Sequence, residues 1–217
     1  MLVFVPAVMV LTLILQKYSS AFDLQIQSVE TSSNGSNKAF KQSDGPCGPK
    51  RDCPENHFSF YIRSGAANAV LPMICFQNHE VLGLEQGNVG DGINVVIVNG
   101  KTGKVTKTGY FNMYSGDAIN DFIPLLKSIE KGSVVLMASF DEPSSKLNEE
   151  ARNLIAQLGS SSVHSLGYRD SWVFVGAKGG GMSSHFEKQL KNDRKTNKYV
   201  DWPELLTMNG CIPMFME

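Results

Sequence analysis

The stretch GINVVIVNGKTGKVTK, residues 92–107, indicates most about how this chain folds. Residues 93–98 are β-branched and apolar except for Asn94, which predicts a buried strand. The dipeptide Asn99-Gly100 follows, and residues 104–107 resume a strand-like pattern. Two strands around an Asn-Gly turn are a strong hairpin signal. The stretch therefore predicts a β-hairpin whose first strand lies in the core.

The rest of the chain adds strands and helices to this hairpin. Strands are predicted where aromatic and β-branched residues concentrate, at 57–62, 71–76, 133–139 and 172–175. Helices are predicted where apolar residues recur at helical spacing, over 119–129 and 147–158, with shorter helical candidates at 185–190 and 202–208. Pro124 belongs in a first turn, so the first helix is expected to begin near Asp121. Ser145 is the expected N-cap of the second.

The N-terminal region is typical of a secreted protein. Residues 2–15 are almost wholly apolar and QKYSSA follows, which predicts a signal peptide over residues 1–21 with cleavage after Ala21. The apolar run is shorter than an ordinary membrane-spanning helix, and the alternative is an uncleaved signal anchor. Residues 22–46 are polar and predict a flexible linker, in which Asn34 begins an N-glycosylation sequon. One folded domain is expected over 47–217.

Secretion gives the cysteines a structural meaning. The chain has four of them, Cys47, Cys53, Cys75 and Cys211. In an oxidising compartment an even number predicts disulfides, and the sequence leaves all three possible connectivities open. Their spacing does not match a zinc site, and two disulfides would leave no thiol nucleophile.

Motifs for catalysis or for nucleic-acid binding are missing from the sequence. Gly100-Lys101-Thr102 resembles the end of a phosphate-binding loop, but Val95 stands where that motif needs glycine. The sequence has no nucleophile elbow, and the four histidines are scattered. A formal net charge of −1 without a basic stripe argues against nucleic acid. The sequence therefore predicts a protein that is not an enzyme and needs no metal or cofactor.

Two strand-end loops carry candidate binding residues. Asp141 and Glu142 follow the predicted strand 133–139, and Arg169 and Asp170 precede the one at 172–175. Loops at strand ends commonly hold ligand sites, and an arginine, a carboxylate and an aromatic suit a sugar. The simpler alternative is that Arg169 and Asp170 form a structural ion pair or fix a turn. Of these residues, Arg169 is the one expected to face a ligand, and the nearby tryptophan is expected in the core.

Several long motifs occur together in one order. They are RSGAAN (63–68), GINVVIVNGKTG (92–103), the Asp141 loop, LGYRDSWVFVGAKG (166–179) and NKYVDWPELLTMNGCIP (197–213). In these motifs the chain resembles the interleukin-like EMT inducer and pancreatic-derived factor family of cytokine-like secreted proteins. The resemblance runs from about Cys47 to Pro213.

The resemblance implies an α+β fold, a compact sandwich of two twisted, mostly antiparallel β-sheets with flanking α-helices. It also implies disulfides Cys47–Cys75 and Cys53–Cys211. One family member uses an extra cysteine in covalent dimers. Val175 occupies the matching position here, so no covalent dimer is expected.

The same domain type occurs in the stem of a glycosyltransferase, where it is regarded as a lectin-like module. Sugar contacts there fall on the arginine of G-R-G-I, on an aspartate in a post-strand loop and on the arginine of G-x-R-D-x-W. Asp141 and Arg169 match the second and third of these. Asp91 replaces the first arginine, which changes the donors available and would repel an acidic sugar.

Three functions follow as hypotheses. The first is a secreted, non-enzymatic signalling protein that acts through a cell-surface receptor. The second is a carbohydrate-binding module that uses Asp141 and Arg169, with Asp91 altering its specificity. These two are compatible, because glycan recognition is one way to engage a receptor. The third, an enzyme, lacks a supporting motif.

Overall fold

The computed structural model describes residues 45–179 and 186–215. These residues form two antiparallel sheets. The four-stranded sheet has the order β3 (His79–Leu82), β2 (Met73–Phe76), β1 (His57–Arg63) and β9 (Thr207–Pro213). The five-stranded sheet has the order β5 (Val105–Phe111), β4 (Gly92–Asn99), β6 (Ser133–Phe140), β7 (Ser171–Ala177) and β8 (Phe186–Leu190). The predicted α+β class with two antiparallel sheets is confirmed.

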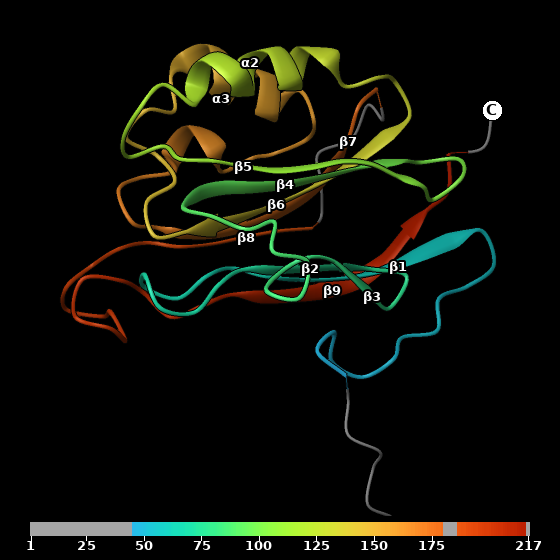
Figure 1. The fold of residues 1–217 in the computed structure, drawn as a ribbon, viewed down its shortest axis with the longest axis horizontal. Coiled ribbons are helices and arrows are strands. Elements are labelled where there is room, and N and C mark those ends of the chain that lie inside the picture. Colours follow the sequence, from blue (N-terminus) through green and yellow to red (C-terminus); the bar gives the residue numbers. More distant parts are fainter. Residues whose placement is uncertain (1–44, 180–185, 216–217) are drawn as a thin grey trace, which may run out of the picture. The chain divides into compact units, whose positions relative to one another are not determined.

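The five-stranded sheet is the middle of three layers (Figure 1). Helices α2 (Ile119–Ser128) and α3 (Glu149–Ala156) cover one face, and the four-stranded sheet packs on the other. Successive strand side chains point to opposite faces, so Ile93 and Val95 pack beneath the helices while Val96 and Val98 pack between the sheets. Burial on both faces explains why the central strands β4 and β6 are rich in apolar residues along their length, with few polar exceptions such as Asn94.

The predicted hairpin is present as β4 and β5, but its turn is longer than two residues. The Asn99 side-chain oxygen accepts hydrogen bonds from the backbone N–H groups of Lys101 and Thr102, at 3.0 and 2.9 Å. The backbone N–H of Gly103 bonds to the carbonyl of Asn99, and Gly103 rather than Gly100 has a positive φ, of 72°. Asparagine therefore acts through its side chain, and the second glycine of the stretch supplies the left-handed position.

Both predicted long helices exist, with corrected starts. Helix α2 begins at Ile119, two residues before the expected start, so Pro124 lies inside the helix rather than in its first turn. Helix α3 is capped by Asn148 and not by Ser145, because the Asn148 side chain accepts from the backbone N–H of Ala151 at 2.9 Å. Asparagine and serine are comparable caps, and sequence alone did not separate them.

The two short helical candidates were wrong. Residues 186–190 form the edge strand β8, and residues 202–206 are irregular before β9. Pro203 disfavours helical backbone at Trp202, the residue before it. Strand β9 alternates exposed and buried residues in the period of a strand that has one face in the core.

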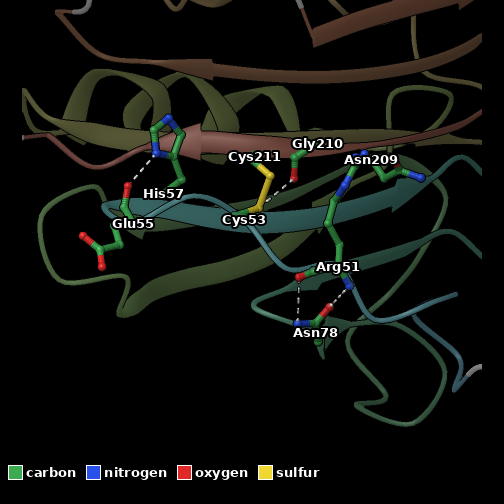
Figure 2. Close-up of a disulfide and its surroundings, with 8 residues drawn as sticks. All are labelled: Arg51, Cys53, Glu55, His57, Asn78, Asn209, Gly210 and Cys211. Atoms are coloured by element: carbon green, nitrogen blue, oxygen red, sulfur yellow. Dashed lines mark hydrogen bonds between the residues drawn. A yellow bond between two sulfur atoms is a disulfide. The ribbon is translucent and has the colours of Figure 1, made fainter.

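Two disulfides fasten an N-terminal segment, Cys47 to Cys53, to the four-stranded sheet. Cys47 pairs with Cys75 on β2 and Cys53 with Cys211 on β9, as the resemblance implied. Figure 2 shows Arg51 near the Cys53–Cys211 disulfide, where its side chain donates to Asn209 Oδ1 at 2.6 Å and its backbone N–H donates to Asn78 Oδ1 at 3.1 Å. All four cysteines are paired, so no free thiol remains.

Several predictions fall outside the described residues. These are the signal peptide over 1–21, all but the last two residues of the linker over 22–46, its glycosylation site Asn34, and the end of the glycine-rich loop after β7. Within the part of the chain that the structure describes, no helix is long and apolar enough to cross a membrane.

Candidate functional site

Asp91, Asp141 and Arg169 lie at one end of the five-stranded sheet. Asp91 immediately precedes β4, Asp141 immediately follows β6, and Arg169 lies two residues before β7. The antiparallel register places Gly92 opposite Phe140, and Ala138 opposite Val173. The three residues therefore meet at the same sheet end, which we call the aspartate end.

Asp91 lies in a turn that requires a glycine both before it and after it. The buried Asn94 side chain bonds to both backbone groups of Gly90, at 3.1 Å to its N–H and 2.7 Å to its carbonyl. Gly92 has φ 95°, and a Cβ there would lie 2.0 Å from the carbonyl oxygen of Phe111. A Cβ on Gly90 would meet the ring of Tyr110 at 2.3 Å. The turn thus fixes the backbone of Asp91 tightly.

Asp141 occupies a left-handed backbone conformation, with φ 54°. Its neighbour Glu142, also a candidate binding residue in the sequence, is buried. Glu142 accepts hydrogen bonds from the N–H groups of Ser144 and Ser145 at 2.8 and 2.9 Å, and from the Ser144 hydroxyl at 2.7 Å. Glu142 therefore closes the loop, and Asp141 is the carboxylate that this loop presents.

Arg169 is positioned by the neighbouring Asp170, although the ion pair of Asp170 is with Lys191 and that of Arg169 is with Asp201. Asp170 is buried and accepts hydrogen bonds from the N–H groups of Gly167 and Asn192, both at 2.8 Å. It also accepts from Gln189 Nε2 at 2.8 Å and Lys191 Nζ at 3.0 Å. These bonds tie the turn before β7 to the end of β8. Arg169 sits in this turn with φ 57°.

Trp202 joins the two loops. Its Nε1 donates to Asp141 Oδ1 at 3.0 Å, and the Arg169 guanidinium lies over its ring, 3.9 Å from the centroid. The same guanidinium lies 4.9 Å from the ring centroid of Tyr168, which is exposed. Arg169 also approaches Asp201, with 3.8 Å between Nη1 and Oδ2. The result is one connected group of a carboxylate, an indole and a guanidinium.

Carboxylates are concentrated beside this group. The pKa of Asp91 is raised above its ordinary value, first because the carboxyl is partly desolvated, although the residue as a whole is exposed, and second because Asp141 lies nearby. Asp201 pairs with Arg194 at 3.1 Å as well as with Arg169. The aspartate end therefore offers hydrogen-bond acceptors around a single stacked arginine.

Sequence reasoning found Asp91, Asp141 and Arg169 but missed Trp202, Tyr168 and Asp201. Trp202 was placed at the start of a helical candidate, and Asp201 lay just before it. The Trp-Pro dipeptide at 202–203 was a usable signal, because the residue before proline favours extended backbone. Trp172, expected in the core, is fully buried, and its Nε1 donates to Glu187 at 2.9 Å. The described residues include no cluster of histidine, cysteine, aspartate and glutamate suited to a metal ion.

Comparison with known proteins places the chain in a family. Residues 91–180, which include Asp91, Asp141 and Arg169, match the family model described as interleukin-like EMT inducer. The chain belongs to this cytokine-like family, whose relatives carry the name FAM3.

Three relatives illustrate the likeness. The chain is 55% identical over 168 residues to Protein FAM3C of Danio rerio, an alignment covering 77% of this chain and 74% of the relative. It is 52% identical to human Protein FAM3C over 167 residues, covering 77% and 73% respectively. It is 50% identical to human Protein FAM3D over 167 residues, covering 77% and 74%.

Proposed function

We propose that this chain is a secreted, non-enzymatic signalling protein that binds a cell-surface receptor through the aspartate end. Membership of a cytokine-like family supports the signalling role and secretion. The single observation that supports the location is the convergence of Asp141 and Arg169 on Trp202.

The backbone at this end favours a contact surface. Asp141 and Arg169 are non-glycine residues held at positive φ, a conformation that costs on the order of 1–2 kcal/mol and persists only where surrounding structure enforces it. Glu142 and Asp170 supply that enforcement through their hydrogen bonds. A rigid group containing tryptophan, tyrosine and arginine has the composition of a binding hot spot.

The chemistry of this surface favours binding over catalysis. The polar groups contact one another, and among residues 45–179 and 186–215 no histidine, serine or cysteine forms a hydrogen bond or ion pair with the Asp141, Arg169 or Trp202 side chains. A nucleophile held by a neighbouring base is the usual basis of acyl or group transfer, and this group of residues contains neither. We accordingly assign it a recognition role.

The test is binding of labelled mature protein to responsive cells, with Arg169→Ala beside Arg194→Ala. Both changes remove an arginine paired with Asp201, but only Arg169 also stacks on Trp202. We expect Arg169→Ala to weaken cell binding roughly tenfold, and Arg194→Ala to change it less than about twofold. Circular dichroism and the melting temperature check that both variants fold. Equal binding by the two variants would remove the aspartate end from the proposal.

A second candidate function is carbohydrate binding at the same end, and the Asp141–Trp202–Arg169 group favours it. Sugars pack on aromatic faces and bond to carboxylates and guanidinium groups. One face of Trp202 is already covered by Arg169, so the exposed Tyr168 ring and Asp141 are the groups left for a sugar.

Titration with simple N-acetylhexosamines separates the candidates, using wild type, Arg169→Ala and Asp91→Arg. Binding by wild type that Arg169→Ala abolishes would support a lectin function despite Asp91. If only Asp91→Arg binds, the acidic residue silences the site, and receptor contact must be with protein. If neither binds, the carbohydrate function is excluded for these sugars.

A further inference from the structure

The opposite end of the five-stranded sheet gathers lysines from three separate turns. Lys101 and Lys104 lie in the β4–β5 turn, Lys131 precedes β6, and Lys178 follows β7. Backbone hydrogen bonds join these turns, from the N–H of Gly100 to the carbonyl of Gly132 at 3.0 Å and from the N–H of Gly132 to the carbonyl of Lys178 at 2.9 Å. We call this end the lysine end.

The lysine end continues onto the edge strand β5. Lys107 is exposed there and lines a shallow pocket of about 220 Å³, together with Asn99, Thr106 and Ser128. Glu130 also lines this pocket, and it is the carboxylate that the turn between α2 and β6 places beside these lysines. Positive charge therefore exceeds negative charge along the three turns.

Four of the lysines at this end differ in their partners from three lysines elsewhere in the fold. Lys127, Lys191 and Lys198 each form an ion pair with a carboxylate. In residues 45–179 and 186–215, no ion pair is found for Lys104, Lys107, Lys131 or Lys178. Lys131 instead lays its side chain against Gly179, where an added Cβ would meet the lysine Cγ at 2.7 Å. Cations without internal partners remain available to an external anion.

The arrangement is a row rather than a pocket. The lysine-bearing turns belong to the neighbouring strands β5, β4, β6 and β7, and adjacent strands lie about 4.8 Å apart. The row therefore spans roughly 15 Å across the sheet end. A single phosphate or carboxylate is too small to contact all of it, whereas a linear polyanion with repeated charges is long enough.

We propose that the lysine end binds a linear sulfated polysaccharide. Every cation in the row is lysine, whose flexible stem and point charge suit sulfates in variable positions, whereas arginine suits fixed, bidentate anions. This function is additional to the receptor contact and lies at the other end of the sheet. Loss of one activity should therefore leave the other intact.

The experiment compares two charge-matched double variants of the disulfide-intact protein on immobilised heparin. Lys104→Gln with Lys131→Gln removes two unpaired lysines, whereas Lys127→Gln with Lys198→Gln removes two lysines paired with Glu150 and Glu204. Wild type should bind with an affinity that falls steeply with salt. The first double variant should bind roughly tenfold or more weakly, and the second within about twofold of wild type. Chemically desulfated heparin should fail to bind wild type.

Three outcomes would overturn the proposal. They are absence of heparin binding by wild type, equal loss in the two double variants, and unchanged binding of desulfated heparin. Vesicles containing phosphatidylserine provide a further comparison. Binding to these vesicles without binding to heparin would assign the surface to an anionic membrane instead. Cell binding by the Lys104/Lys131 variant, assayed after heparinase treatment, should match wild type, which separates this result from a failure of the receptor proposal.

Discussion

The two ends of the five-stranded sheet differ in whether their charged side chains have partners within the protein. At the aspartate end, Arg169 stacks on Trp202 and approaches Asp201, and Lys191 binds the buried Asp170. At the lysine end, backbone bonds between turns hold the cations near one another, and within residues 45–179 and 186–215 no ion pair is found for Lys104, Lys107, Lys131 or Lys178. One end of the sheet therefore carries a rigid surface whose charged groups contact one another, and the other end carries an open electrostatic surface.

The contrast predicts where substitutions will cost folding stability. Side chains that make contacts at the aspartate end are part of the fold, so removing those contacts should lower the free energy of unfolding. Neutralising an exposed lysine such as Lys104 at the lysine end should change it by less than about 0.5 kcal/mol. The predictions below test the aspartate end, and Glu187 on the edge strand β8, in order of decreasing effect.

Gly92→Ala should have the largest effect. Alanine would have to adopt a positive φ of 95°, and its Cβ would lie 2.0 Å from the Phe111 carbonyl oxygen. Because this oxygen belongs to the backbone, the clash cannot be relieved by rotating a side chain. We expect a loss of about 3–4 kcal/mol in the free energy of unfolding, measured by urea denaturation. Gly116→Ala is the control, because Gly116 also has positive φ, 72°, but has nothing within 4 Å of an added Cβ. The control should cost about 1 kcal/mol, and equal costs would contradict the steric argument.

Asp170→Ala should cost about 3 kcal/mol, because it leaves the N–H groups of Gly167 and Asn192 and the Gln189 amide without their acceptor. Lys191→Ala removes the ion pair with Asp170 and a hydrogen bond to the Ser165 carbonyl but leaves the turn's backbone bonds to Asp170 in place, and Lys191 is 56% exposed, so its cost should be no more than about 0.5 kcal/mol. Thermal and urea unfolding measure both. A similar cost for the two variants would mean that Asp170 stabilises the protein through its ion pair with Lys191 and not through its hydrogen bonds to the turn.

Glu187→Gln tests a carboxylate on β8 that has the opposite titration behaviour from Asp91. Partial burial alone would raise the pKa of Glu187, but hydrogen bonds from Ser160, Ser162, Trp172 and Ser161 together outweigh it and lower the pKa. The stabilisation is therefore present above the unfolded pKa, about 4.3, and is lost as pH falls through the lower folded value.

At pH 7 the Glu187→Gln variant should be less stable by roughly 1–2 kcal/mol. The difference from wild type should stay constant down to about pH 5 and shrink below about pH 4. Urea denaturation at several pH values measures it. A difference that grows in acid would show that the direction of the pKa shift is wrong.

Trp202→Phe should cost about 1 kcal/mol, because it keeps an aromatic ring beneath Arg169 but loses the hydrogen bond from Nε1 to Asp141. A double-mutant cycle with Asp141→Ala isolates this bond. The coupling energy should be close to the cost of the Trp202→Phe change. Additive costs would show that the two loops are joined by something other than this bond.

Asp91→Asn should have the smallest effect, and its sign is stabilising. The raised pKa of Asp91 means that ionisation is penalised in the folded protein, so this penalty sets in as pH rises above the unfolded pKa of about 3.9. Solvent screens this exposed residue, so the gain at pH 7 should be roughly a few tenths of a kcal/mol and should vanish in acid. Differential scanning calorimetry at pH 7 and at about pH 3 compares the two states. A loss of stability at neutral pH would contradict the assigned cause.

The core strands were predictable from sequence because both of their faces are buried. Residues such as Val95 and Val96 then need not alternate with polar ones. Strands at or near the edge of a sheet were harder to predict from the sequence. Strand β8 has a weakly alternating, half-polar sequence, and β9 carries its alternation through a glycine and a cysteine. The caps and the hairpin turn depended on which of several suitable side chains reached a given N–H group.

The functional residues at the two ends of the sheet also differed in how readily the sequence revealed them. Asp141 and Arg169 were visible because each adjoins a strongly apolar strand. Trp202 was not, because its contact with Asp141 spans 61 residues of sequence and forms only when β6 and the segment before β9 are packed together. The lysine end was hidden for a related reason, since a formal net charge of −1 says nothing about where Lys131 and Lys178 lie.

The disulfide from Cys53 to Cys211 has a consequence for proteolysis. It spans 158 residues and encloses both sheets, both helices and both ends of the five-stranded sheet. A protease that cuts once in a surface loop between these cysteines leaves the two fragments covalently joined. Such a cut would be invisible on a non-reducing gel and would separate the fragments only after reduction. Release of a fragment from this part of the fold therefore requires a second cut between the two cysteines, or reduction of the disulfide.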